Sequence, residues 1–335
     1  MDYKNDTTPA TMKDVAEVAG VLTATVSRTL MNPEKVSSQT RKRVEQAVLT
    51  VGYAPHALAR HVKRSESRTL LKIVPDICDP FFTDVLRGIE ETAAKQGYLV
   101  LIGDCAHQHQ KEKSFVDLII TKQIDGMLLL GANLPPMVMV NEFSPDLKLP
   151  TVHIDNLTAA FDAVYYLHRL GHRRIACIAG PENMHLSEYR LQGYIQALRR
   201  SGIQVDNQYI YRGSFSYETG VNGLMMLMKH PAPPSAIFCH SDMMAMGVLS
   251  QAKKMKLDVP KDLSLVGFDD IEQAQYCFPA LTTVAQPRYE LGCESMHLLL
   301  EELQGHAVPS GSRLLNSKLV IRDSTATPNY ARYRV

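Results

Sequence analysis

The chain has 335 residues, 45% of them hydrophobic, and a formal net charge of +1, which favours two or three domains with large apolar cores. The N-terminus, MDYKNDTTPA, is polar and no apolar run reaches the roughly 18 residues of a membrane span, so we expect neither a signal peptide nor a membrane partner. The six cysteines are scattered without a CxxC pair, which indicates reduced thiols in the cytoplasm rather than disulfides or a zinc site.

Three short helical patterns lie between residues 11 and 64. Thr11 and Asp14 form a capping start, and Gly20 is the kind of residue that ends a helix in a left-handed cap. Only about three residues separate that glycine from the next helical run, and two helices joined so tightly must cross steeply, as in a helix-turn-helix. The expected second and third helices span residues 23–31 and 37–51.

The second of these helices has the composition of a DNA-reading helix. Val26 and Leu30, four residues apart, are expected to face inward. Short side chains at its N-terminal end can approach base edges, and an arginine can fork onto a guanine. The expected DNA contacts on this helix are Thr23, Ala24, Thr25, Ser27 and Arg28.

Positive charge is concentrated in the same segment. Residues 11–64 hold nine Lys or Arg and four Asp or Glu, a net charge of +5, so the rest of the chain sums to −4. Phosphate attraction acts over about 10 Å of screening length, so this local excess counts for more than the total charge. The segment therefore predicts a DNA-binding head; a small surface bundle with solvated charges is the alternative.

From residue 70 onward, short buried-strand patterns alternate with helical ones, from LLKIVP through DGMLLLG and RRIACIAG to LTTVAQ. Repeated βα units of this length predict parallel sheets covered on both faces. The strands are too many for one core, so we expect two lobes of doubly wound sheet with a ligand cleft between them at the strand ends.

The motifs TMKDVAEVAG, TATVSRTLMN and RKRVEQAVLTVGYAP resemble the head of the lactose/galactose repressor family, and the likeness continues through DPFFTDVLRGIEE, GHRRIACIAGP and LSLVGFDDIE. The resemblance implies an N-terminal all-α helix-turn-helix head plus hinge helix, followed by a two-lobed, periplasmic-binding-protein-like α/β effector domain of doubly wound parallel sheets. It implies a head at 11–54, a hinge helix and linker at 55–67, and an effector-binding and dimerisation domain at 68–335. The implied lobe 1 covers about 68–155 plus 282–312, and lobe 2 covers about 156–281 plus 313–335, with crossings near 155, 281 and 312.

The chain departs from the family pattern at three places. Leu22 replaces a capping serine before the DNA-reading helix, and Val62 replaces a leucine wedge for the minor groove, so both predict a weaker hold on DNA. Only residues 132–134 separate DGMLLLG from PPMVMVN, too few for the crossover helix of relatives, so we expect an uncovered patch of the first sheet or a rearranged strand. In the hinge, the resemblance implies DNA contacts by Arg60, Val62 and Lys63.

The expected effector pocket is built from side chains at strand ends. Phenylalanines there can stack on a flat ring, while an arginine and an aspartate offer directional hydrogen bonds to sugar hydroxyls or a ring amide. Core packing remains the alternative for the two adjacent phenylalanines, and a turn cap for the aspartate. The expected effector-binding residues are Phe81, Phe82, Arg190, Phe215 and Asp269.

The resemblance also bears on which ligand the pocket takes. In the purine-responsive branch of the family, positions matching all of these residues except Phe81 line the effector pocket. The matching base-reading arginine and threonine there are Met184 and Leu186 in this chain, so purine is disfavoured. The resemblance is strongest to a cytidine-responsive branch in enteric bacteria, over VPDICDPFF, YLVLIGDCAHQ and LIITKQIDGMLLLG.

By this resemblance the chain is a homodimeric, cytoplasmic, nucleoid-associated repressor. Its affinity for operator DNA would be controlled by a small molecule, by resemblance cytidine, and it would cooperate with the cyclic-AMP receptor protein. Other nucleosides or sugars remain open as effectors. Two other classes of protein also remain open: a nucleoside-processing enzyme and a periplasmic-type binding protein.

No catalytic residue, metal site or cofactor is expected from the sequence. His107 and His109 have a spacing that could bind metal, but exposed histidines are commoner. The adjacent residues His240, Ser241 and Asp242 cannot form a triad and read better as a strand end and helix cap. Neither GxGxxG nor GxxxxGK occurs.

Overall fold

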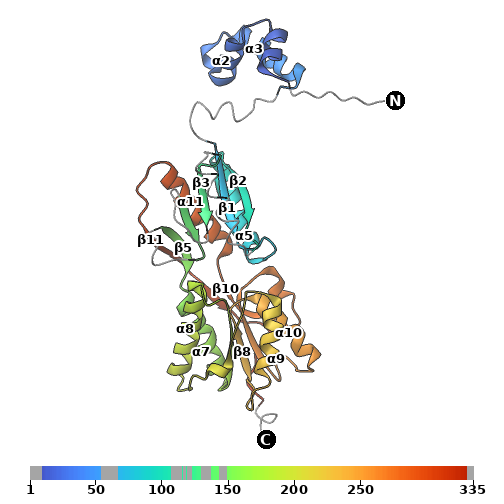
Figure 1. Ribbon diagram of the computed structural model, residues 1–335, viewed down its shortest axis with the longest axis vertical. Helices are drawn as coiled ribbons and strands as arrows, with labels where there is room; N and C mark the ends of the chain where they lie inside the picture. The colour runs from blue at the N-terminus through green and yellow to red at the C-terminus, as the bar shows by residue number, and fades with distance from the viewer. Residues whose placement is uncertain are drawn as a thin grey trace, which may run out of the picture. The chain divides into compact units, whose positions relative to one another are not determined.

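The computed structural model describes residues 10–53, 67–106, 115, 118, 123–129, 137–142 and 149–329. The chain divides into two compact units, residues 1–68 and 69–335. The first holds the predicted helical head, and the second holds two lobes, each built on its own sheet (Figure 1). The predicted hinge helix, 55–67, lies almost wholly outside the described residues. No helix in the described ranges is long and apolar enough to cross a membrane.

The head packs its helices around one small core. It begins at the predicted capping box, in which Thr11 and Asp14 hydrogen-bond to each other's backbone N–H, and its first helix ends at Gly20 with φ 61°. The elements are α1 (Met12–Ala19), α2 (Thr23–Met31), the 3-10 helix η1 (Pro33–Lys35) and α3 (Ser38–Val51). The buried core residues are Val15, Ala16, Ala19, Val26, Val44, Ala47 and Tyr53.

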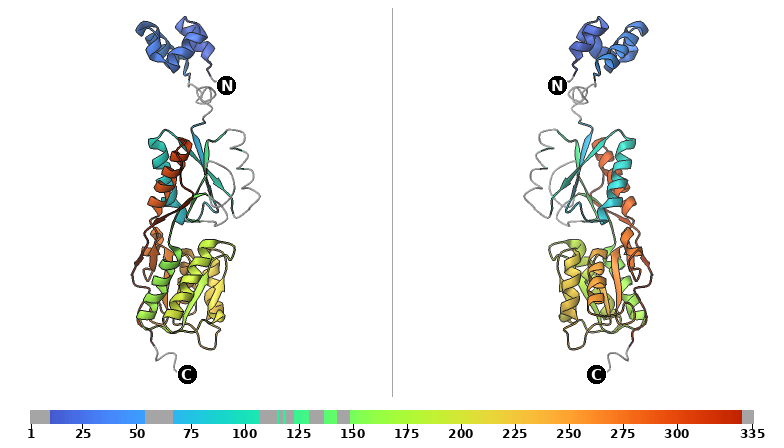
Figure 2. Two further views of the ribbon diagram at one scale, coloured as in Figure 1. Left: turned by 90° about the vertical axis from the view of Figure 1, so that its left-hand side faces the viewer. Right: turned by 90° about the vertical axis from the view of Figure 1, so that its right-hand side faces the viewer.

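Lobe 1 is a parallel sheet with strand order β11-β5-β4-β3-β1-β2. Its strands are β1 (Thr69–Val74), β2 (Leu99–Asp104), β3 (Gly126–Leu129), β4 (Met137–Val140), β5 (Pro150–Ile154) and β11 (Gly311–Leu315). Helices α5 (Phe81–Lys95) and α11 (Arg288–Leu303) pack side by side on one face (Figure 2). Apolar residues of both helices, such as Ile89 and Leu291, share a buried core with Leu70 of the sheet.

Lobe 2 is a second sheet with strand order β12-β10-β9-β8-β6-β7, parallel except for the antiparallel edge strand β12. Its strands are β6 (Ile175–Ala179), β7 (Ile210–Arg212), β8 (Ala236–Cys239), β9 (Ser264–Asp269), β10 (Thr282–Ala285) and β12 (Lys318–Val320). The helix pair α7 (Asn156–Arg169) and α8 (His185–Arg200) covers one face, and α9 (Tyr217–Leu227) and α10 (Asp242–Lys254) cover the other. Short 3-10 helices lie at Asn207–Tyr209 (η2) and Glu272–Gln275 (η3). The predicted doubly wound, two-lobed fold is confirmed.

The chain passes between the lobes three times, and two of these crossings differ from the predicted places. The first follows Ile154, as expected. Strand β10 pairs with β9 in lobe 2, so the second crossing follows Ala285, four residues beyond the predicted region near 281. Strand β11 pairs with β5 in lobe 1 as far as Leu315, so the third crossing comes after 315 and not near 312.

Strands β3 and β4, joined by the short connection noted in the sequence, are parallel neighbours with Met127 opposite Met137. The expected strand rearrangement is therefore wrong, while the connection itself, 130–136, lies outside the described residues. The described parts of both strands are buried, so they do not form an uncovered patch. Exposed apolar side chains occur instead on the edge strand β2, at Leu99, Leu101 and Ile102.

Candidate DNA-reading head and effector pocket

Helix α2 carries the five predicted DNA contacts of the head. Thr23, Ala24 and Arg28 are exposed, and Thr25 and Ser27 are half-buried. The residue that precedes the helix as its N-cap, Leu22, is 77% exposed and supplies no side-chain hydrogen bond to the first turn. The N-terminal end of α2 thus presents short side chains to solvent, with Arg28 exposed further along the helix, but the helix lacks the usual cap.

Two head residues have structural roles that sequence reasoning missed. Thr29 is buried beside Val26, and its Oγ1 donates to the carbonyl of Thr25 at 2.8 Å. Arg43, one of the nine basic residues in 11–64, donates to the carbonyls of Ala19 (2.6 Å) and Gly20 (3.2 Å). It therefore satisfies carbonyls at the end of α1 that would otherwise lack donors. The hinge contacts predicted for Arg60, Val62 and Lys63 lie outside the described residues.

A cavity of about 650 Å³ lies between the two lobes, and the five predicted effector residues all line it. Phe81 and Phe82 come from the start of α5 in lobe 1, while Arg190 and Asp269 come from α8 and the end of β9 in lobe 2. The sequence also placed Met184 and Leu186 here. Lining residues that it missed are Pro75, Asp76, Cys78, Asp79, Asn141, Pro181, Ser214, Ser216, Tyr217, Glu218, Ser241 and Met243.

The aromatic wall in lobe 1 is held by the turn before α5. Asp79 accepts a hydrogen bond from the N–H of Phe81 at 2.9 Å, which fixes the chain as it enters the helix. The rings of Phe81 and Phe82 meet edge to face with centroids 5.1 Å apart. Both rings are largely buried, so their edges at the cavity are rigid apolar surface.

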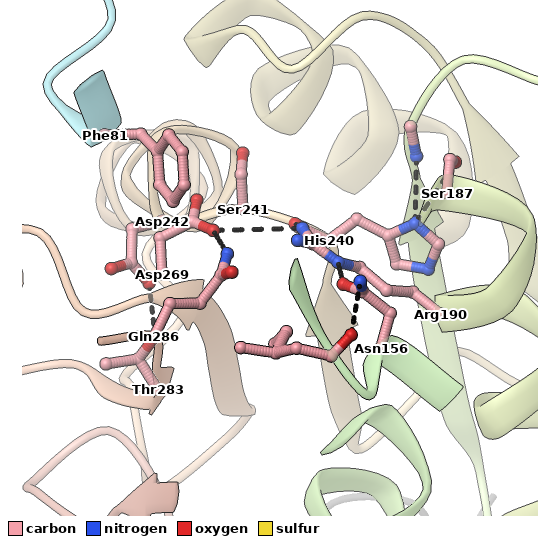
Figure 3. Close-up of polar contacts among 12 residues, drawn as sticks. Phe81, Asn156, Ser187, Arg190, His240, Ser241, Asp242, Asp269, Thr283 and Gln286 are labelled. Atoms are coloured by element: carbon pink, nitrogen blue, oxygen red, sulfur yellow. Dashed lines mark hydrogen bonds and ion pairs between the residues drawn. The ribbon is translucent and has the colours of Figure 1, made fainter. Parts of the chain in front are cut away.

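Arg190 is the buried cation of the pocket. Its guanidinium lies 3.7 Å above the ring of Phe268. It donates from Nε to Asn156 at 2.8 Å and from Nη1 to the carbonyl of His240 at 2.5 Å, and it lies 3.8 Å from Asp269 (Figure 3). Burial lowers the pKa of Arg190 to about 10, against the opposing effect of Asp269. The group therefore stays protonated at neutral pH.

Asp269 faces Arg190 from the end of β9. Gln286 donates to its Oδ1 at 2.7 Å, and its backbone has φ 115°, a conformation that only a well-supported residue keeps. Burial raises the pKa of Asp269 to about 7, opposed by Arg190. Asn156 follows the first crossing and Gln286 the second, so both charged pocket residues are tied to the connections between the lobes (Figure 3).

The segment His240–Asp242 is structural, as the sequence indicated. Ser241 caps α10 by accepting the N–H of Met244, and Asp242 accepts the N–H of Ile271 at 2.9 Å and the hydroxyl of Thr283 at 2.6 Å. Burial raises the pKa of Asp242 and lowers that of His240. Both therefore favour the neutral form.

His240 and Cys177 place a histidine and a thiol 3.4 Å apart in the same core. Both are fully buried, and burial raises the pKa of the Cys177 thiol, so it is an inert packing residue rather than a nucleophile. Within the described ranges no group of His, Cys, Asp or Glu is arranged to hold a metal ion. The pair His107 and His109 falls outside them.

Comparison with known proteins agrees with this geometry. Residues 11–56 match the bacterial regulatory proteins of the lacI family, and residues 164–325 match the periplasmic binding protein-like domain. The chain is 64% identical to the HTH-type transcriptional repressor CytR of Escherichia coli (strain K12), over 97% of this chain and 99% of the relative. It is 33% identical to the catabolite control protein A of Priestia megaterium, over 94% of this chain and 99% of that one.

A solved structure of the lac repressor dimer bound to operator and the anti-inducer ONPF superimposes with a TM-score of 0.84 at 27% identity, covering 95% of this chain and 99% of that one. The transcriptional regulator CelR in complex with cellobiose gives a TM-score of 0.72 at 28% identity, covering 94% and 99%.

Proposed function

Because the chain belongs to the lacI family and is an effector-controlled, DNA-binding transcriptional repressor, we propose that its effector is cytidine, bound in the cavity between the lobes. The cavity carries the proposal: it joins phenylalanine rings, a buried guanidinium and an aspartate in about 650 Å³, within the range of small-molecule sites. The resemblance to a cytidine-responsive branch, noted in the sequence, points the same way.

The charges of the pocket favour an unphosphorylated ligand. Asp76, Asp79, Glu218 and Asp269 line the cavity, whereas Arg190 is the one basic residue among its described lining. Carboxylates at this density repel a phosphate ester in a partly dry site. A free nucleoside therefore fits better than a nucleotide or a sugar phosphate.

The shape of the lining favours a pyrimidine. Met184 and Leu186 give the α8 wall an apolar surface where the purine-responsive branch has an arginine and a threonine. The ring would stack against Phe82 and Phe215, and the ribose hydroxyls would hydrogen-bond to the aspartate and guanidinium described above. We assign all five predicted residues, Phe81 included, to this site.

For DNA, we propose that each head places α2 in a major groove of the operator. Thr23, Ala24, Thr25, Ser27 and Arg28 would face the base edges, with the arginine reading a guanine. The hinge would add contacts by Arg60, Val62 and Lys63 in the minor groove and on phosphates.

The active form in this proposal is a homodimer. Leu99, Leu101 and Ile102 on the edge strand β2 are 71%, 48% and 48% exposed, and Tyr276 and Phe278 of lobe 2 are 71% and 102% exposed. Apolar clusters of this kind mark protein interfaces. We place both clusters against the second subunit.

The repressor would act on the nucleoid in the cytoplasm, with the cyclic-AMP receptor protein as a partner at promoters.

A gel shift on a palindromic operator, at two salt concentrations and with a panel of nucleosides and sugars, tests the proposal. We expect cytidine alone in the panel to change operator affinity. A shift that no ligand alters, or one that answers only to a sugar, would contradict cytidine as the effector. Adding the cyclic-AMP receptor protein to the same assay tests whether the two proteins bind DNA cooperatively. Incubating the protein with cytidine and recovering the cytidine unchanged would contradict a nucleoside-processing activity.

A further inference from the structure

Helix α8 begins without a cap of its own. Its N-cap residue, Met184, has no side-chain oxygen, and the helix start makes no side-chain cap hydrogen bond within lobe 2. The first N–H groups of a helix have no partner inside the helix and need one from outside. Here the N–H of Leu186 donates to Oε1 of Glu142 at 3.2 Å.

Glu142 belongs to the other lobe. It lies two residues beyond the end of β4 and is 8% exposed, so its carboxylate is removed from water where it meets the helix. A negative charge at this position is stabilised by the positive end of the helix dipole. It also acts on Arg190, one turn further along α8, because its charge is one of those that raise the pKa of that guanidinium.

This contact lies beside the effector pocket. Asn141, next to Glu142, lines the cavity from lobe 1, and Met184, Leu186 and Arg190 line it from α8. The bond to Leu186 can exist only while the lobes are as close as they are here, since opening them would pull the carboxylate from the helix. From this geometry we infer that Glu142 is a latch, a helix cap supplied by one lobe to the other, which holds the pocket around its ligand.

The inference rests on the proposed function for the identity of the ligand, whereas the contact between Glu142 and α8 can be tested without any ligand. Opening of the latch exposes the amide of Leu186, which hydrogen–deuterium exchange reports in the ligand-free protein. Cytidine affinity, measured by calorimetry on the full-length protein, reports the effect on binding. Glu142→Ala removes the acceptor, and Glu142→Gln keeps an acceptor without the charge. Asp206→Asn is the matched control, because that carboxylate caps η2 within lobe 2 by accepting the N–H of Gln208.

We expect Glu142→Ala to speed exchange in peptides covering 184–189 and to weaken cytidine binding about tenfold, and Glu142→Gln to weaken it about threefold. Asp206→Asn should leave both the exchange rate in these peptides and the cytidine affinity unchanged. The latch would be overturned if Glu142→Ala exchanged its amides and bound cytidine as the wild-type protein does. The same holds if the variant only had a lower melting temperature, with exchange and cytidine affinity unchanged. If wild-type protein does not bind cytidine, the proposed effector fails, and the exchange rates alone decide on the latch.

Discussion

The guanidinium of Arg288 contacts Asp84 at 2.9 Å, and the same nitrogen donates to the backbone carbonyl of Asp270, also at 2.9 Å. Asp84 lies on α5 in lobe 1, and Asp270 follows β9 in lobe 2. The arginine stands at the start of α11, just beyond the second crossing. It therefore joins the helix that begins with Phe81 to the strand end that carries Asp269.

Replacing Arg288 with Met should uncouple the two sides of the pocket. Lost hydrogen bonds to charged groups cost about 1.5–3 kcal/mol, so we expect cytidine affinity to fall about tenfold or more, with operator affinity in the absence of ligand changed less than about twofold. Calorimetry and gel shifts measure the two quantities. Arg87→Met is the control, since Arg87 meets the same Asp84 at 4.0 Å with its side chain 63% exposed. Equal losses in both variants would contradict the role of Arg288.

Giving α2 a cap should strengthen the head. Leu22→Ser supplies the missing oxygen, and we expect it to raise the free energy of unfolding of the head by about 0.5–2 kcal/mol and to tighten operator binding. Scanning calorimetry and a gel shift follow the two effects. Leu49→Ser, an equally exposed leucine on α3 at 78%, removes the same apolar surface without creating a cap. A gain in Leu49→Ser as large as in Leu22→Ser would show that the cap is not its source.

One variant in the head and one in the hinge should distinguish contacts that read bases from contacts that bind phosphates. Arg28→Ala should cost about 1–3 kcal/mol on the preferred operator and relax the choice of base at one position. Lys63→Ala should weaken all sequences alike and reduce the slope of affinity against salt by about 1. Competition gel shifts over a salt series measure both. The assignment of Arg28 fails if its loss weakens every sequence equally.

Lys72 is a lysine inside the core of lobe 1. It lies on the same face of β1 as Leu70 and Val74, which face the core beneath α5 and α11, and it is 0% exposed. Its Nζ has no hydrogen-bond partner in the part of the chain that the structure describes. Burial lowers the pKa of this ammonium from 10.5 to about 7.

The stability of the protein should therefore rise with pH between about 7 and 10.5, because the unfolded chain keeps a proton on Lys72 that the folded protein releases. Lys72→Met fills similar space without the charge, and we expect it to raise the free energy of unfolding at pH 7 by on the order of 4 kcal/mol. This difference in the free energy of unfolding between Lys72→Met and wild type should shrink as pH approaches 10. Urea titrations at several pH values, with the surface variant Lys95→Met as control, test this. A constant gap between Lys72→Met and wild type would rule out the titration.

Local signals predict the head almost completely. Thr11, Asp14, Gly20 and Gly52 act within a turn of where they stand, so the helix limits follow from neighbouring residues. The pocket residues also come together as expected, because carboxyl ends of parallel strands meet at one edge of a sheet. Whether they bind an effector stays a prediction.

The partners of the pocket residues could not be found in this way. Asn156 and Gln286 reach Arg190 and Asp269 only because the first two crossings bring them there, and Glu142 reaches α8 from another lobe. Such contacts depend on how the two sheets face each other, which no short pattern records. The second crossing, which the family resemblance implied near 281, lies after Ala285 because β10 pairs with β9 in lobe 2, and TTVA alone does not show which sheet it joins.

The described head is one uninterrupted run of sequence, whereas each lobe is assembled from separate runs threaded through three crossings. A head can consequently be grafted onto another effector core by a single junction in the segment after Tyr53. The hybrid protein would bind the operator of the head under control of the ligand of the core. Exchanging one lobe would need three matched junctions at 155, 286 and 316. New combinations of operator and effector are for that reason expected to arise far more readily than new combinations of lobes.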